Sequence, residues 1–367
     1  MGERIFLSSP HMCGNEMAYI NEAFETNWIA PLGKNVTEFE HEMCQITGSP
    51  QAIAMSAGTA ALHMALRYLG VGRGDVVFCT SMTFAASCNP IVYEGGTPVF
   101  IDSEPGSWNM SPVALKKAFE KYPNPKAIVV VNLYGQSADY DEILKLAKEH
   151  NVPVVEDAAE SLGATYKGQM TGTIGDFGIL SFNGNKIITT SGGGMLLCKT
   201  KEEKDKIVKW ITQSRDPARH YQHTELGFNY RMSNICAGIG RGQLTALDER
   251  VAKKTEIFNT YREAFSDIPV DMMPVCDYGV PNFWLSCMTV RGTDPVKLME
   301  ALEAENIESR PIWKPMHLQP FYEGCDYFMH DGDVSKGIFE TGICLPSDTK
   351  MTKEEQNRVI EIIKAQF

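Results

Sequence analysis

The chain has 367 residues, enough for two or three domains or for one large α/β body with a smaller appendage. Hydrophobic residues make up 43% and charged residues 22% of it, which excludes a disordered, collagen-like or coiled-coil protein. The formal net charge of −12 argues against a nucleic-acid partner, because such a partner would need a basic surface. An anionic small molecule stays compatible with this charge, since a local pocket can be positive on an acidic protein.

The ten cysteines are scattered, without a CxxC pair or the short spacings of a disulfide framework. Several lie within apolar runs, among them Cys79 and Cys198, so we expect reduced thiols in a cytoplasmic protein. Residues 1–7 contain no apolar segment of the signal-peptide type. No apolar run approaches the ~20 residues that a membrane-spanning helix needs, so we expect no membrane insertion.

Seven short apolar or β-branched runs, each bounded by turn residues, predict the strands of one sheet. Most are continuously apolar, which is typical of strands buried on both faces of a parallel sheet. Helical patterns separate many of them, so we predict a doubly wound α/β body with a mostly parallel sheet. The last two runs are too close for a crossover helix, which leaves room for an antiparallel strand there. The runs are residues 51–56, 75–80, 97–102, 127–134, 153–158, 177–182 and 194–198.

Residues 235–265 carry one long helical pattern, which we expect to lead out of the large domain. Pro269 and Pro274 then mark a change in composition, followed by a predicted strand at residues 283–290. A capping box at residues 352–355 begins the final helix. We therefore predict a large domain of residues 1–254 and a smaller C-terminal α+β domain of residues 255–367.

Residues 56–62 form a strand-to-helix turn that contains Gly58 and Thr59. Free backbone N–H groups at such a helix start would hold a phosphate, and the Thr59 hydroxyl adds a donor. The alternative is an ordinary turn between a strand and a helix, which the pattern alone does not exclude.

Asp157 closes an apolar strand, at the edge of the sheet where ligands of open α/β folds bind. A carboxylate there can bind a cationic ring nitrogen. The alternative is that Asp157 caps the following helix.

Lys186 follows residues 181–185 in a turn rich in Gly, Ser and Thr, between two predicted strands. A lysine that is partly desolvated has a lowered pKa and serves as a nucleophile for Schiff-base chemistry. The alternative is a surface lysine on a β-turn.

Together the three features supply a phosphate cup, a carboxylate for a pyridinium nitrogen and a lysine for an aldehyde. That combination predicts a site for pyridoxal phosphate. Phe84, just after the second predicted strand, either stacks on the cofactor ring or packs in the core.

Motifs at five places, in consistent order, resemble the DegT/DnrJ/EryC1/StrS family of pyridoxal phosphate-dependent sugar aminotransferases. The resemblance runs from residues 27–33 (NWIAPLG) to residues 310–317 (RPIWKPMH). It implies an aspartate aminotransferase-like transferase of fold type I with a central seven-stranded sheet. Residues 7–12, 102–112 and 132–139 resemble the branch that aminates UDP-4-keto-6-deoxy-N-acetylhexosamines. The five motifs are SAGTAALHMAL, TFAAS, DAAES, SFNGNK with TTSGGGM, and GFNYRMSNI.

The resemblance implies that Lys186 binds the cofactor aldehyde and moves the proton. It implies that Asp157 pairs with the pyridine nitrogen. Glu160 matches the position that approaches the 3-hydroxyl of the ring, where Gln or His is commoner in the family. Relatives that dehydrate sugars carry His in place of the lysine, so Lys186 favours transamination.

The resemblance further implies that Gly58, Thr59 and Ser181 hold the phosphate and that Phe84 covers the ring. Asn229 matches a position that reaches the phosphate from a neighbouring subunit, which implies a homodimer with shared active sites.

His220 and His223 are spaced like metal ligands, but no third ligand accompanies them, and we expect no metal site. Candidates for contacts with the nucleotide sugar come from two segments, with packing or a solvated loop as the alternative roles. They are Trp28, Ile29, Arg310, Lys314 and His317.

These observations predict an aminotransferase that moves an amino group from L-glutamate to C4 of a UDP-4-keto-6-deoxy-N-acetylhexosamine in surface-glycan biosynthesis. One alternative is a dTDP-linked 3- or 4-keto sugar or a cyclitol as the substrate. Another is a regulatory protein that binds pyridoxal phosphate without turnover, against which the acidic charge and the lack of a basic DNA-binding segment argue.

Overall fold

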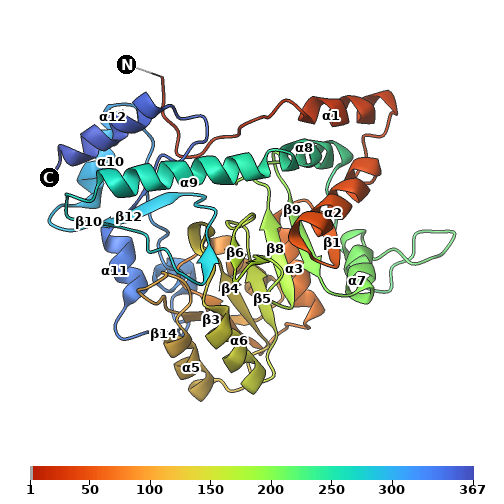
Figure 1. The fold of residues 1–367 in the computed structure, drawn as a ribbon. Helices are drawn as coiled ribbons and strands as arrows, with labels where there is room; N and C mark the ends of the chain where they lie inside the picture. The colour runs from red at the N-terminus through yellow and green to blue at the C-terminus, as the bar shows by residue number, and fades with distance from the viewer. Residues whose placement is uncertain (1–2) are drawn as a thin grey trace.

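A computed structural model describes residues 3–367. Its centre is an eight-stranded sheet in the order β1-β9-β8-β5-β4-β2-β3-β14 (Figure 1). β9 runs antiparallel to both of its neighbours, and the other neighbouring pairs are parallel. The strands are β1 (Gln51–Met55), β2 (Val76–Thr80), β3 (Thr97–Ile101), β4 (Ala127–Val131), β5 (Val154–Asp157), β8 (Phe177–Ser181), β9 (Gly194–Cys198) and β14 (Tyr327–Phe328).

The predicted mostly parallel sheet is confirmed, and each of the seven predicted runs contributes a strand. The predicted number of seven strands in the sheet is too low by one, because β14 from the C-terminal part of the chain pairs with β3. A strand of two residues has too few positions to show a periodic pattern, which is why the sequence did not reveal it.

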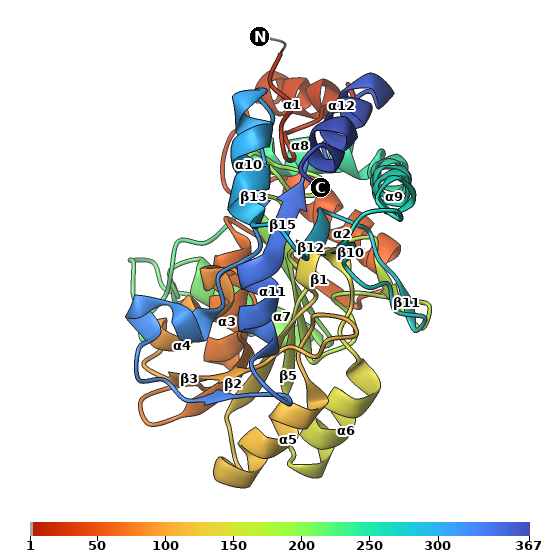
Figure 2. The same cartoon turned by 90° about the vertical axis from the view of Figure 1, so that its left-hand side faces the viewer.

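Helices cover both faces of this sheet, as continuously apolar strands require. One face packs against α3, α4 and α7, and the other against α5 and α6 at one side and α2 and α8 at the other. Figure 2 shows α5 and α6 at the far end of the molecule from α10 and α12. These helices are α2 (Lys34–Thr47), α3 (Gly58–Tyr68), α4 (Asn89–Tyr93), α5 (Pro112–Lys121), α6 (Tyr140–Glu149), α7 (Lys201–Ile211) and α8 (Asn234–Leu244).

The single helix predicted for residues 235–265 is wrong. The chain forms α8 and then α9 (Leu247–Ala264), with a break at Thr245 and Ala246. At the break the backbone bonds run to the third residue back, from Thr245 N to Gly242 O and from Ala246 N to Gln243 O. Gly242 brings α8 so close to α1 (Glu16–Glu25) that a Cβ on it would lie 2.6 Å from the backbone nitrogen of Glu16. α8 packs on the large sheet, whereas the second half of α9 packs on a second sheet.

α9 packs on a second, four-stranded antiparallel sheet in the order β10-β12-β15-β13, together with α10 and α12. The predicted capping box is confirmed, because Thr352 and Glu355 cap α12 reciprocally. The domain boundary at 254/255 falls within α9 and stays a prediction. The elements are β10 (Val270–Met272), β12 (Ser286–Val290), β13 (Arg310–Pro311), β15 (Gly342–Leu345), α10 (Pro295–Ala304), α11 (Val334–Thr341) and α12 (Lys353–Lys364), with a small third sheet of β6 (Thr165–Tyr166), β7 (Gln169–Met170) and β11 (Gly279–Val280).

Candidate active site

A cavity of about 400 Å³ lies where the carboxyl ends of β4, β5 and β8 meet the start of α3. This is the edge at which open α/β sheets bind ligands. Eight of the predicted site positions were assigned to the cofactor, and seven of these line this one cavity. They are Gly58, Thr59, Phe84, Asp157, Glu160, Ser181 and Lys186.

One end of the cavity is formed by the first turn of α3. The residue before the helix, Ala57, has an extended backbone, and no side chain caps the helix start. Gly194 in β9 permits this arrangement, because a Cβ on it would lie 2.2 Å from the backbone nitrogen of Gly58. With Thr59 and Ser181 alongside, this end offers N–H and hydroxyl donors that suit an anion such as a phosphate.

Asp157 ends β5 and is buried in the wall of the cavity. Its Oδ2 atom accepts a hydrogen bond from the hydroxyl of Ser87 at 2.7 Å, and its Oδ1 atom accepts one from the backbone nitrogen of Ala159 at 3.1 Å. Burial raises the pKa of Asp157, against those hydrogen bonds and the charge of Lys186. A buried carboxylate in these surroundings is suited to a cationic partner.

Lys186 lies in the turn between β8 and β9, with 12% of its side chain exposed. Its Nζ atom is 3.8 Å from Oε1 of Glu160 and 3.8 Å from the centre of the Trp284 ring. Burial lowers the pKa of Lys186, while the charges of Glu160 and Asp157 oppose the shift. A lowered pKa increases the share of the neutral amine, which is the nucleophilic form.

Glu160 is held from two sides. Its Oε2 atom accepts from the backbone nitrogen of Tyr134 at 2.7 Å, and its Oε1 atom accepts from the indole nitrogen of Trp313 at 3.2 Å. Burial raises the pKa of Glu160, opposed first by the charge of Lys186. The backbone of Tyr134 has a φ of 51°, which is a left-handed conformation and is strained for a tyrosine. Residues with such backbone strain are found more often at functional sites than elsewhere.

The residues that line the cavity but were not predicted as site residues include Ser87, Trp284 and Trp313. Trp313 lies within the RPIWKPMH motif, so a signal existed for it. Ser87 closes the TFAAS motif, so a signal existed for it as well. Trp284 carried no signal beyond its place in a predicted strand, since only the fold brings residue 284 over residue 186.

A second cavity of about 600 Å³ adjoins the first and contains Arg310 and Lys314 in its wall. The two cavities share Phe84, Trp284 and Trp313 among their lining residues. The side chain of Phe84 is 55% exposed, so it faces open space rather than the core. The core alternative for Phe84 is therefore disfavoured.

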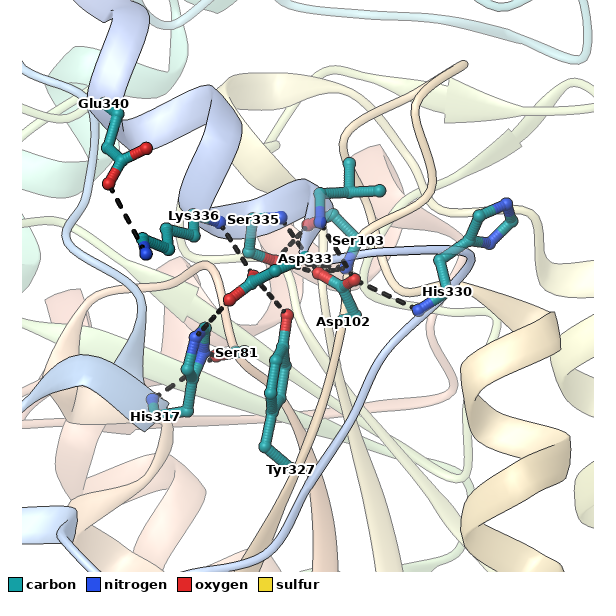
Figure 3. Close-up of polar contacts among 11 residues, drawn as sticks. Ser81, Asp102, Ser103, His317, Tyr327, His330, Asp333, Ser335, Lys336 and Glu340 are labelled. Carbon is teal, nitrogen blue, oxygen red and sulfur yellow. Dashed lines mark hydrogen bonds and ion pairs between the residues drawn. The ribbon is translucent and has the colours of Figure 1, made fainter.

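His317 lies outside the residues that line either cavity. Its Nδ1 atom contacts the hydroxyl of Ser81 at 2.7 Å, and its Nε2 atom contacts Asp333 at 3.3 Å (Figure 3). The ring stacks on Tyr327 at 3.6 Å. Both ring nitrogens are therefore engaged in contacts that join the end of β2 to the start of α11.

The remaining predicted residues lie apart from both cavities. Trp28 lines a separate cavity of about 270 Å³ beside α1 and α2, and Ile29 next to it is 55% exposed. Asn229 is exposed in the segment between α7 and α8. His220 and His223 are exposed in the same segment, and within residues 3–367 no group of three or more His, Cys, Asp or Glu side chains could hold a metal ion.

The residues of the first cavity fit pyridoxal phosphate. The uncapped start of α3 suits its phosphate, the buried Asp157 suits its ring nitrogen, and the buried amine of Lys186 suits its aldehyde. The polar side chains of Asp157, Lys186 and Glu160 are costly to bury without partners, and a polar ligand with a protonated ring nitrogen, a hydroxyl and an aldehyde would supply those partners.

The sequence matches the model of the DegT/DnrJ/EryC1/StrS aminotransferase family over residues 10–364. The chain belongs to this family. EpsN of Bacillus subtilis (strain 168), provisionally named a pyridoxal phosphate-dependent aminotransferase, is 52% identical over 99% of this chain and 96% of its own length. A GDP-perosamine synthase of Caulobacter vibrioides is 38% identical over 97% of this chain and 96% of its own length.

Among solved structures, the pyridoxal phosphate form of Spr1654 from Streptococcus pneumoniae, provisionally named a sugar aminotransferase, superposes with a TM-score of 0.91. It is 27% identical and the match covers 99% of this chain and 98% of that chain. The protein is thus a pyridoxal phosphate-dependent sugar aminotransferase with the fold of that family, as the motifs predicted. No helix among residues 3–367 is long and apolar enough to cross a membrane.

Proposed function

We propose that this aminotransferase moves an amino group from L-glutamate to C4 of a UDP-linked 4-keto-6-deoxy-N-acetylhexosamine for a surface glycan. The observation that carries the proposal is the pair of adjoining cavities. Lys186 lies in one, and Arg310 and Lys314 lie in the other. A nucleotide sugar matches this layout, because its keto carbon would reach Lys186 while its diphosphate meets two cations.

Two observations bear on the nucleotide of the substrate, and they support different nucleotides. The motifs at residues 7–12, 102–112 and 132–139 support UDP by resemblance. The identity with GDP-perosamine synthases, 38% for that of Caulobacter vibrioides, supports a GDP-linked sugar as the second candidate.

The residues of the first cavity have the following proposed roles. Bound pyridoxal phosphate would supply an aldehyde carbon that can carry the amino group and a ring that withdraws electrons from the reacting carbon. Lys186 binds the cofactor at rest, and its Nζ atom then carries the proton removed from, or returned to, the reacting carbon. Asp157, oriented by its hydrogen bonds from Ser87 and Ala159, would hold a proton on the ring nitrogen.

Other residues position the cofactor and exclude water. Gly58, Thr59 and Ser181 would hold the phosphate, and Glu160, which lies beside Lys186, would approach the 3-hydroxyl of the ring. Phe84 would cover the ring and, with Trp313, lines both cavities, where the two aromatic side chains would help to exclude water.

We also propose a homodimer in the cytoplasm. Asn229 is exposed and lies outside its own cavity, as expected of a residue that completes the site of a second copy. Large apolar side chains are exposed on α1, on the loop between α1 and α2, and on the segment before α8, among them Phe24, Trp28 and Leu226. The ten cysteines are free, which suits a reducing compartment.

The proposal is tested with a panel of 4-keto sugars linked to UDP, GDP and dTDP, with L-glutamate as the donor and 2-oxoglutarate as the measured product. We expect kcat/KM to be at least about tenfold higher for the UDP-linked N-acetyl sugar, corresponding to about 1.4 kcal/mol. Preference for the GDP-linked sugar would discard UDP and keep the amino transfer. Lack of turnover with every sugar would reject the proposed reaction.

A further inference from the structure

Lys254 is a buried lysine that the proposed reaction does not use. It lies on α9, away from the cavity lining, and only 2% of the residue is exposed. Its ammonium donates to the backbone oxygen of Trp284 at 2.9 Å and to the hydroxyl of Ser8 at 3.1 Å. Burial lowers the pKa of Lys254 to about 7, opposed by the charge of Asp348, so an amine at this position is costly to bury and calls for a function.

Both partners of Lys254 act on the same atom. The indole nitrogen of Trp284 donates to the backbone oxygen of Asn185 at 2.6 Å, and the hydroxyl of Ser8 donates to that oxygen at 3.0 Å. Asn185 immediately precedes Lys186. The two donors therefore fix the carbonyl side of the peptide bond that leads into Lys186.

The other side of that peptide bond is fixed as well. The backbone nitrogen of Lys186 donates to the backbone oxygen of Asn183 at 3.0 Å. The ring of Trp284 meanwhile lies 3.8 Å from the Nζ atom of Lys186. Trp284 thus holds both ends of Lys186, its backbone through the indole N–H and its amine through the ring face.

We propose that Lys254 is a positioning residue for Lys186. It acts through Trp284 and Ser8, whose donors orient the peptide bond before Lys186. The inference rests on the role proposed above for Lys186. It joins three parts of the chain that are distant in sequence, since α9, the N-terminal segment and the loop before β12 converge on the turn that carries residue 186.

The test replaces Lys254 by Met, a side chain of similar length without donors. In the full chain freed of cofactor, Lys186 is labelled competitively with acetic anhydride across a pH series, and the modified peptide is quantified by mass spectrometry. The titratable groups that face Lys186 are Glu160 and Asp157, and both are unchanged in this variant. We expect the apparent pKa of Lys186 to rise toward the ~10.4 of an exposed lysine, because its cover by Trp284 loosens.

Lys253→Met is the matched control, because Lys253 is the neighbouring residue on α9 and pairs with Glu256 at the surface. It should leave the labelling of Lys186 at the wild-type profile. Lys254→Arg, which keeps the charge and the donors, should restore the profile in part. An unchanged labelling profile of Lys186 in Lys254→Met would overturn the proposal. A fall in the thermal unfolding midpoint without a change in that profile would show that Lys254 has only a structural role.

If Lys254→Met does not fold, Ser8→Ala provides the same readout, because it removes one of the two donors to Asn185 and leaves Lys254 in place. A shift in the same direction supports the proposal, and no shift overturns it. The labelling uses neither sugar nor cofactor, so an error in the proposed substrate leaves it unaffected. Turnover by Lys186→Ala would reject the role of Lys186 itself, which is a separate outcome.

Discussion

The Nζ atom of Lys186 lies 3.8 Å from the centre of the Trp284 indole ring, in a cation–π contact when the amine is protonated. Glu160 lies at the same distance from that atom. The amine is thus held between an aromatic face and a carboxylate, close to Asp157 in the same cavity. This arrangement brings together residues from three separate segments of the chain.

Replacing Lys186 by Ala should lower the rate of amino transfer by at least about 10³-fold, because it removes both the nucleophile and the proton carrier. Borohydride should also no longer fix the cofactor to the protein. Lys201→Ala is the control, since 77% of the Lys201 side chain is exposed on α7. Appreciable turnover by Lys186→Ala would disprove the assignment.

Replacing Ser87 by Ala should lower kcat about 10- to 100-fold. The change removes the hydrogen bond to Oδ2 of Asp157, and a bond to a charged group contributes about 1.5–3 kcal/mol. Steady-state kinetics measures the effect, with Ser266→Ala on the surface as the control. A wild-type kcat in Ser87→Ala would mean that this bond does not support Asp157.

Replacing Asp102 by Asn should lower the unfolding midpoint at pH 7 by about 3–5 °C, from a loss of about 2–4 kcal/mol. The buried carboxylate of Asp102 accepts from the backbone nitrogens of His330 and Val334 and from both donors of Ser335 (Figure 3). It thereby anchors the start of α11 to the end of β3. Asp331→Asn, in the same segment and 81% exposed, is the control.

The effect of Asp102→Asn should also depend on pH. Burial alone would raise the pKa of Asp102, but its hydrogen bonds, first those of Ser335, outweigh burial and lower it. A lowered pKa gives stability that is complete above the unfolded value of ~3.9 and is lost as the pH falls through the folded value. The midpoints of the variant and the wild type should therefore converge in acid. A constant difference down to that range would contradict this reading.

Replacing Arg310 and Lys314 by Ala should raise KM for the nucleotide sugar about tenfold and leave the half-reaction with L-glutamate unchanged. The two cations line the second cavity, which the amino donor would not need to fill. Lys336→Ala, on the exposed side of α11, is the control. If the variant slows the half-reaction with L-glutamate as much as the half-reaction with the nucleotide sugar, Arg310 and Lys314 act at the reacting centre instead.

Mixed dimers test the proposed sharing of sites. Lys186→Ala and Asn229→Asp should each be nearly inactive, the second because its carboxylate would repel the cofactor phosphate. In a hybrid of the two, one site carries both defects and the other carries neither. Co-refolding should then restore up to about a quarter of the wild-type activity, since about half of the dimers are hybrids with one intact site. No recovery would contradict a shared site.

Local signals in the sequence predicted much of this structure. Continuous apolar runs identify the buried strands. Gly58, Asp157 and Lys186 each lie at or after the end of such a run, so we could expect them to meet at one edge of the sheet. The break between α8 and α9 escaped prediction, because the approach of Gly242 to Glu16 is a tertiary contact. The role of Trp284 could not be predicted for the same reason, because its contact with Lys186 is also a tertiary contact.

The central claim is tested most directly by the absorption spectrum of the purified, cofactor-loaded protein before and after addition of a UDP-4-amino-6-deoxy-N-acetylhexosamine alone. We predict that the visible band of the bound pyridoxal form disappears, because the amino sugar returns its amino group to the cofactor in the reverse half-reaction. If the absorbance of this band is unchanged by the amino sugar and decreases only with L-glutamate, the proposed substrate is contradicted. A protein that shows no cofactor band after reconstitution with pyridoxal phosphate would contradict the site itself.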